Sequence, residues 1–326
     1  MDTAQLNRDL SDEQSALDEV VAGLDDAAWS LPTPSERWSV ADQIAHLTFF
    51  DRAAVLAIED PDAFGALFEA LLGSAVDGDE GVDAHTLGEF RAMSPADLLE
   101  AWREGRRRLE RAADSLEEGA RVNWFGPPMS GRSFLTARLM EVWAHGQDIC
   151  DAVGATRQPT ARLAHIARLG FLTRGWTFTN RGEVPPVSDV RVELVAPDGS
   201  RWDFGPADAA ERVSGGAEDF CLVVTQRRHL DDTELDVVGD DALIQHLSET
   251  ARPYIYTTAL PPAQAAATLV AVKHARRDEW RREKLAGLIA RFRAGVQRHG
   301  LQAIVSDSPI QPILCGGDAS AMAMSS

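Results

Sequence analysis

The chain has few cysteines and no long apolar run. Its three cysteines, Cys150, Cys221 and Cys315, are far apart and form no CxxC pair, which argues against a disulfide framework and against a thiolate zinc site. No apolar segment approaches the roughly 20 residues of a membrane span. The N-terminal MDTAQLNRDLSDEQ lacks the basic and apolar regions of a signal peptide. We therefore expect a cytoplasmic protein with no membrane partner.

Positive charge is scarce and unevenly distributed. The formal net charge is −19, which argues against binding to nucleic acid or to an anionic membrane. Lysine occurs only at Lys273 and Lys284, against thirty arginines, a bias that indicates a GC-rich, actinobacterial genome. Residues 251–326 carry ten Lys/Arg and five Asp/Glu, whereas residues 1–250 carry 22 and 46. This change in charge predicts a boundary near residue 250.

Four segments before residue 180 have the pattern of long helices. Start signals precede three of them: SDEQ at 11–14, SVAD at 39–42 and SPAD at 94–97, where Ser is a favourable N-cap ahead of an apolar stripe. A fourth helix is predicted from about residue 133 to 153. Four such helices favour an N-terminal bundle. The acidic segment 73–88 is predicted to be a long loop, of a length typical of mobile lids.

The period of the apolar residues changes after residue 185. DVRVELVAPDGSRWDFG (189–205) alternates on both sides of a Pro-Asp-Gly-Ser turn, which predicts a β-hairpin. The segment 210–228 is interpreted as a further strand that includes Cys221. Residues 231–248 predict a short strand and the start of a helix. These elements predict a small α+β domain.

The complete prediction is an α+β protein in three parts. Residues 1–180 form a four-helix bundle, residues 181–248 the small α+β domain, and residues 249–326 a partial α/β tail fragment. In the tail, Ala- and Arg-rich helical segments accompany one predicted strand, in SDSPIQPILCGGD. A single strand with an exposed edge does not make a complete fold.

Glu141, His145 and Asp148 share one face of the predicted fourth helix. Positions four apart lie about 40° apart around a helix, and positions seven apart about 20°. A carboxylate and an imidazole four apart can bind one divalent metal. His46, in the predicted second helix, is the best candidate for a third ligand. Two histidines and one glutamate leave a tetrahedral position open, which is typical of a catalytic zinc site.

Other readings of these residues remain open from the pattern alone. A Glu and a His four apart often form a surface pair, and a lone histidine in a helix is often a satisfied core residue. Asp42 and Asp148 are candidates to orient the imidazoles by accepting their second N–H. His85 is a weaker candidate ligand, and His165 and His229 are interpreted as structural or solvated.

Two segments, WSVADQIAHLTFFD and ARLMEVWAHGQDICDAVG, together resemble the DinB-like, mycothiol-dependent maleylpyruvate isomerase superfamily. NWFGPPMSGRSFLTARLMEVWAHGQDICDA and DFCLVVTQRRHLDDTELDVVGD resemble an uncharacterised actinobacterial metal-binding branch of it, over about residues 5–243. Within the second of these, VVTQRR also resembles a short domain named for wyosine base formation, which with this acidic balance we do not interpret as RNA-binding.

The superfamily resemblance implies that His46, Glu141 and His145 hold a divalent metal, usually zinc. It also implies that mycothiol, a small-molecule thiol, reacts as a metal-stabilised thiolate with a small electrophile, in an isomerisation or an S-transfer. A metal-binding module without turnover is one alternative. A pyridoxal-phosphate-dependent enzyme, suggested by the end of the chain, is a second and less favoured one. The oligomeric state is left open.

ARPYIYTTALPPAQAAATLVAVKHARRDEWRREK and the residues after it resemble the C-terminal domain of 8-amino-7-oxononanoate synthase, a pyridoxal-phosphate enzyme, from about Asp241 onward. The large cofactor domain of that family has no counterpart here. Lys273 and Lys284 lie in arginine-rich helical segments, away from the place of the family's imine-forming lysine, which a pyridoxal-phosphate site requires. We therefore expect no pyridoxal phosphate and interpret residues 244–326 as a fused fragment.

Overall fold

The computed structural model describes residues 2–180, 184–239, 279–299, 301–303, 306 and 313–314. The chain divides into two compact units, residues 1–259 and residues 260–326.

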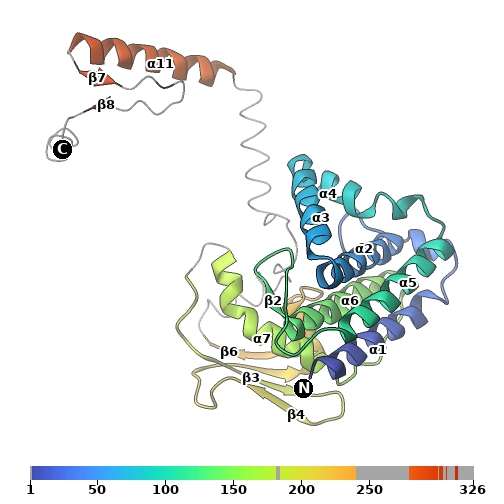
Figure 1. The fold of residues 1–326 in the computed structure, drawn as a ribbon. Helices are drawn as coiled ribbons and strands as arrows, with labels where there is room; N and C mark the ends of the chain where they lie inside the picture. The colour runs from blue at the N-terminus through green and yellow to red at the C-terminus, as the bar shows by residue number, and fades with distance from the viewer. Residues whose placement is uncertain are drawn as a thin grey trace. The chain divides into compact units, whose positions relative to one another are not determined.

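Four long helices of the first unit form a bundle: α1 (Thr3–Val21), α2 (Val40–Glu59), α5 (Pro95–Asp114) and α6 (Gly131–Val153). Both α1 and α2 pack against α5 and α6 (Figure 1). The four apolar stripes meet in a continuous core, because each helix turns its hydrophobic face away from water. The fully buried side chains of this core include Leu10, Leu17, Ile44, Leu47, Trp102, Leu109, Phe134 and Leu135. The predicted four-helix bundle is confirmed.

Local signals fixed several of the helix ends. Ser39 caps α2 in a reciprocal capping box with Asp42, and the Ser94 side chain accepts from the Asp97 backbone N–H at the start of α5. At the end of α6, Gly154 takes a left-handed conformation with φ 67°, which costs glycine little. In each case one side chain or backbone conformation satisfies groups that the helix end leaves unpaired.

The predicted start of the first helix is wrong. The helix begins at Thr3, where the Asp2 carboxylate accepts a hydrogen bond from the Gln5 backbone N–H. Ser11 therefore lies in the middle of α1 and caps nothing. Leu6 and Leu10, both buried, extend the apolar stripe by two turns before the Ser11 signal. The gain from burying them outweighs the local preference of serine for a cap.

The prediction of a loop at residues 73–88 is also wrong. The region between α2 and α5 contains α3 (Pro61–Ser74), the 3-10 turn η2 (Ala75–Asp77), α4 (Gly78–Leu87) and a second turn, η3 (Phe90–Ala92). α4 contacts both α2 and α3. The buried carboxylate of Asp83 explains why it folds back: it accepts from Trp38 Nε1 at 3.2 Å and pairs with Arg37 at 3.3 Å. An acidic segment whose composition is typical of a solvated loop thus contributes a buried side chain to tertiary contacts.

A small mixed sheet and two helices follow the bundle in the same unit. After α7 (Leu163–Asn180) come β3 (Val190–Val195), β4 (Arg201–Phe204), β5 (Glu211–Gly216), α8 (Ala217–Val224) and β6 (Asp236–Val238), and the sheet order is β4-β3-β5-β6. β3 and β4 form the predicted antiparallel hairpin, whereas β3 and β5 are parallel. α7 packs on α8 and β4.

The strand predicted over residues 210–228 is only half correct. β5 ends at Gly216 and the chain continues as α8, so Cys221 and Val223 are buried on a helix. The apolar stretch around Cys221 is short, and in so short a stretch the spacing of apolar residues does not distinguish a helix from a strand. The remaining short elements of this unit are η1 (Ala28–Ser30), β1 (Arg121–Val122), β2 (Met129–Ser130) and η4 (Leu230–Asp232).

In the second unit, the structure describes α11 (Glu279–Arg298) and two short antiparallel strands, β7 (Gln302–Ala303) and β8 (Ile313–Leu314). β8 lies within the segment predicted as a strand. Lys284 is exposed on α11, whereas Lys273 and the helix predicted after β6 lie outside the described residues. Among the helices that are described, none has the length and hydropathy to cross a membrane.

Candidate metal centre

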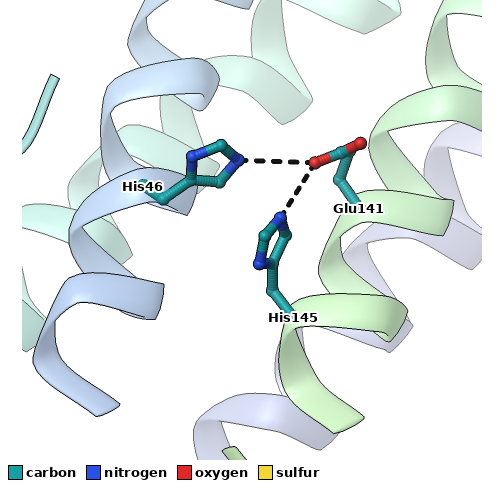
Figure 2. Close-up of side chains that lie close together, drawn as sticks. All are labelled: His46, Glu141 and His145. Atoms are coloured by element: carbon teal, nitrogen blue, oxygen red, sulfur yellow. Dashed lines mark hydrogen bonds and ion pairs between the residues drawn. The ribbon is translucent and has the colours of Figure 1, made fainter. Parts of the chain in front are cut away.

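The candidate site lies where α2 faces α6. His46 is in the second turn of α2, and Glu141 and His145 occupy successive turns of α6, so their side chains point toward one another across the helix interface (Figure 2). Ile44 and Leu47 on α2 and Val142 on α6 are fully buried in the core around them. These apolar neighbours hold the two helices at the spacing that brings the polar side chains together.

One carboxylate oxygen joins the three residues. Glu141 Oε2 lies 3.1 Å from His145 Nε2 and 3.4 Å from His46 Nε2 (Figure 2). One ligand atom of each residue lies within 4.8 Å of the other two. The side chains of His46, Glu141 and His145 are 8%, 7% and 11% exposed, so the cluster is shielded but accessible. These three predicted residues are brought together.

Aromatic rings surround the imidazoles. The Trp38 ring centroid lies 5.0 Å from that of His46 and 6.0 Å from that of His145, with the second pair stacked. The Phe50 ring centroid lies 4.5 Å from that of His46, and the Phe125 ring centroid lies 5.3 Å from that of Phe50. Rings of this kind exclude water, which strengthens electrostatic interactions inside the site.

The environment favours the metal-binding forms of two of these side chains. Burial, together with electrostatic repulsion from His145, lowers the pKa of His46 to about 4. Burial of the Glu141 carboxyl acts to raise its pKa, but hydrogen bonds from His145 and His46 outweigh this and hold the pKa well below its usual range. At neutral pH the site therefore offers a carboxylate and a neutral His46 imidazole, which are the forms that bind metals.

The donor set fits a divalent cation. Two imidazole nitrogens and one carboxylate oxygen suit zinc and related ions, and they come from two rigid helices, as in other bundle metal sites. The carboxylate oxygen faces both Nε2 atoms, so an ion could replace the protons between them without moving either helix. Three protein ligands leave a fourth tetrahedral position free.

The two predicted orienting carboxylates are placed differently from each other. Asp42 accepts from Ser39 and from Arg91 Nε at 2.7 Å, so the contacts observed for its carboxylate serve the cap of α2 and hold Arg91. Asp148 does lie near the cluster, with its Oδ2 3.9 Å from His145 Nδ1. That distance is too long for a hydrogen bond.

Two residues near His145 were missed from the sequence. Gln43 is fully buried, and its Oε1 lies 2.5 Å from His145 Nδ1. Arg227, which follows α8, donates to both oxygens of Asp148, at 2.8 and 3.2 Å. Gln43 precedes His46 by three positions and so shares its helix face, a signal that could have been used. No local pattern links Arg227 to a helix 79 residues away.

Backbone strain lies next to this site. Among the described residues, the non-glycine positions with positive φ are Arg37 at 69° and Gln226 at 59°. Each immediately precedes a residue at or near the cluster: Trp38 contacts both imidazole rings, and Arg227 binds Asp148. Such conformations cost about 1–3 kcal/mol each and tend to occur at functional sites.

The other histidines considered as ligands are placed elsewhere. His85 is exposed on α4, with its ring 5.8 Å from that of Phe49. His165 lies 2.7 Å from the Asp9 carboxylate, and His229 is 49% exposed beside Asp231. None of the three belongs to the metal-ligand cluster found among the described residues.

Comparison with known proteins assigns the part of the chain that contains the bundle to a family. Residues 10–150 match the family model described as mycothiol maleylpyruvate isomerase N-terminal domain. An uncharacterized protein of Mycobacterium tuberculosis is 45% identical over 234 residues, which cover 72% of this chain and 90% of that protein. A solved structure of the mycothiol-dependent maleylpyruvate isomerase is 19% identical with a TM-score of 0.47, covering 70% of this chain and 90% of that one.

The later parts of the chain match other families. Residues 186–238 match a model described as wyosine base formation, and residues 237–326 match aminotransferase class I and II. The 8-amino-7-oxononanoate synthase of Xanthomonas oryzae is 57% identical over 121 residues, which cover 37% of this chain but only 30% of that enzyme. The chain thus spans less than a third of the synthase. Over 72% of its length the chain belongs to one family with the Mycobacterium tuberculosis protein, and residues 10–150, which include the candidate site, belong to the family of the mycothiol maleylpyruvate isomerase N-terminal domain.

Proposed function

We propose that the chain binds one divalent metal ion, zinc, through His46, Glu141 and His145, and that it catalyses a mycothiol-dependent isomerisation or S-transfer on a small electrophile. The observation that carries this proposal is the convergence of three ligand atoms from α2 and α6 within 4.8 Å. Mycothiol enters the proposal through the family to which residues 10–150 belong.

The charge of the site suits a thiolate. A bound divalent metal would supply positive charge that lowers the pKa of a thiol. Glu141 compensates one of the two positive charges, so the site retains an attraction for one further anion. The surrounding rings of Trp38 and Phe50 keep water away and strengthen that attraction. The limited exposure of the three side chains favours a small-molecule electrophile over a macromolecular one.

The tail is proposed to take no part in this chemistry. All residues assigned to the site precede residue 240, within residues 1–259. We keep the boundaries 1–180, 181–248 and 249–326 for the bundle, the small domain and the fused fragment. A pyridoxal-phosphate reaction is the poorer proposal, since the chain covers 30% of the synthase that it resembles.

The first experiment measures metal content. The full chain is purified without a His-tag or added metal and analysed by elemental mass spectrometry, and we expect about one zinc ion per chain. The variants His46→Ala and Glu141→Ala should lose it. His85→Ala is the matched control, because His85 is an exposed histidine outside the cluster, and it should keep full metal content. Full occupancy in the first two variants would disprove the assignment.

The second experiment measures turnover. Zinc-loaded protein is incubated with mycothiol and with cis-configured, electron-poor alkenes, and both isomerisation and thiol adducts are followed. We expect turnover that needs both the thiol and the three ligands. Stoichiometric zinc without any thiol-dependent turnover would instead indicate a metal-binding module.

A further inference from the structure

A chain of hydrogen bonds connects His145 to the turn before α2. The Thr33 hydroxyl donates to the Trp38 carbonyl at 3.0 Å. Gln43 Nε2 donates to the Thr33 hydroxyl oxygen at 2.8 Å, and Gln43 Oε1 lies 2.5 Å from His145 Nδ1. Thr33 and Trp38 come from the loop before α2, Gln43 from α2 and His145 from α6.

The direction of each hydrogen bond follows from the number of protons available. A threonine hydroxyl has one proton, and Thr33 gives it to the Trp38 carbonyl, which can only accept. The hydroxyl oxygen must then accept from Gln43, so the NH₂ group of the amide faces Thr33. The amide oxygen faces His145, and an oxygen that only accepts requires a proton on Nδ1.

A proton on Nδ1 determines what Nε2 can do. In the neutral imidazole, the nitrogen without a proton carries the lone pair that binds a metal. His145 Nε2 is the atom that faces Glu141 at 3.1 Å. In the metal-free site, Nε2 shares a proton with the Glu141 carboxylate. If a metal displaces that proton, a ring that keeps its other proton on Nδ1 directs the freed Nε2 lone pair toward the point where the carboxylate and the two imidazoles meet.

No other acceptor competes for this proton among the described residues. The Asp148 carboxylate is 3.9 Å from Nδ1, and both of its oxygens are held by Arg227, with Ser35 Oγ a further donor at 3.2 Å. Gln43 is fully buried, so water cannot easily replace its amide oxygen.

We propose that Gln43, oriented by Thr33, is a positioning residue that holds His145 in the Nδ1–H tautomer and so prepares Nε2 as a metal ligand. The proposal rests on the metal site of the proposed function. It assigns the orienting role to a neutral amide, where the sequence pattern had suggested Asp42 or Asp148. Partners of this type commonly change metal affinity about 10- to 100-fold.

Three substitutions test whether the hydrogen bonds from Thr33 through Gln43 to His145 affect zinc affinity, which is measured by competition with a chelator. Gln43→Met keeps the size of the side chain but removes the acceptor, and it should weaken zinc binding about 10- to 100-fold. Gln43→Glu keeps an acceptor and should retain most of the affinity. Thr33→Val should also weaken zinc binding, but by less than Gln43→Met. The Gln43 amide is still present in this variant, although the hydrogen bond that orients it is lost.

Thr48→Val is the matched control. Thr48 is a fully buried threonine of α2 whose hydroxyl donates to the Ile44 carbonyl of its own helix at 2.7 Å, so its loss tests general damage to α2. Zinc affinity should not change in this variant. Equal affinity in the wild type, Gln43→Met and Thr33→Val would overturn the proposal.

Nitrogen-15 NMR of the His145 ring gives a readout that general destabilisation would not produce. We expect a proton on Nδ1 in both the metal-free and the zinc-loaded wild type, and in Gln43→Met we expect this proton to exchange rapidly with water. A metal-free protein with the proton on Nε2 alone would mean that the amide is turned over, and the proposal would be wrong. A wild type that binds no zinc would disprove the proposed function itself.

Discussion

Asp148 on α6 and Arg227 after α8 form a buried ion pair, with 2.8 Å between Arg227 Nη2 and Asp148 Oδ2. The side chains are 5% and 11% exposed. The guanidinium also donates to the Thr225 carbonyl at 2.7 Å. The ion pair therefore links the segment after α8 to α6, the helix that carries Glu141 and His145.

Removing the guanidinium should destabilise the metal-free protein. Arg227→Met leaves the Asp148 carboxylate buried without its partner, and we expect the free energy of unfolding to fall by about 3 kcal/mol, measured in urea with chelator present. Arg201→Met is the control, because Arg201 is 66% exposed beside Glu193, and a change below about 0.5 kcal/mol is expected there. Equal losses in both variants would contradict the role of the pair.

Zinc should stabilise the fold by binding only its native form. At a free zinc concentration 100 times the dissociation constant, the expected gain is about 2.7 kcal/mol, which raises the thermal midpoint by several degrees. A chelator should reverse the shift. His145→Ala should show no shift at the same zinc concentration. Magnesium is the matched ion control, because it prefers oxygen ligands and retains its water, and it should leave the midpoint unchanged.

Asp18 should contribute to the acid sensitivity of the bundle. Burial acts to raise the pKa of Asp18, but the hydrogen bond from Arg103 and the charges of Arg106 and Arg103 lower it below 3.8. The unfolded chain therefore binds the proton more tightly than the folded chain. The stabilisation is present above pH 3.8 and is lost as the pH falls through the lower folded value.

Unfolding in urea at a series of acidic pH values tests this contribution. Asp18→Asn should lower stability at neutral pH and should reduce the further loss on acidification below pH 3.8. Asp26→Asn is a control, because Asp26 is exposed in the turn after α1. If Asp18→Asn lost as much stability on acidification as the wild type, other carboxyl groups would account for the acid sensitivity.

Residues 260–326 should be dispensable for the metal site. A chain that ends at residue 259 retains the first compact unit, and we expect its zinc stoichiometry and thermal midpoint with zinc to match those of the full chain. Loss of zinc from the shortened chain would show that the second unit supports the site.

Pyridoxal phosphate should not form an imine with the full chain. After incubation with the cofactor and removal of the excess, we expect no visible absorbance band of a lysine–pyridoxal imine. Lys284 is exposed on α11 among arginines, which gives its amine no enclosed pocket. A stable band that borohydride abolishes would instead support a pyridoxal-phosphate reaction.

Much of the fold followed from patterns that span only a few residues. The Ser39 and Ser94 caps, the Gly154 stop and the hairpin around Gly199 all involve groups within about four positions of each other, so the sequence determines them directly. The pairing of Glu141 with His145 is of the same kind, because a helix brings positions four apart together wherever it lies. These features did not depend on where the rest of the chain packs.

Contacts between distant segments were decided only by the tertiary structure. Segment 73–88 is helical because Asp83 has partners in the turn before α2, and Asp42 serves a helix cap and Arg91. Arg227 reaches Asp148 from the segment after α8, and Gln43 on α2 meets His145 on α6. In each case the side chain has several locally acceptable roles, and burial selects the one that leaves fewest polar groups unpaired. The sequence therefore determined which residues could form the site, and packing of α2 against α6 decided how they are oriented.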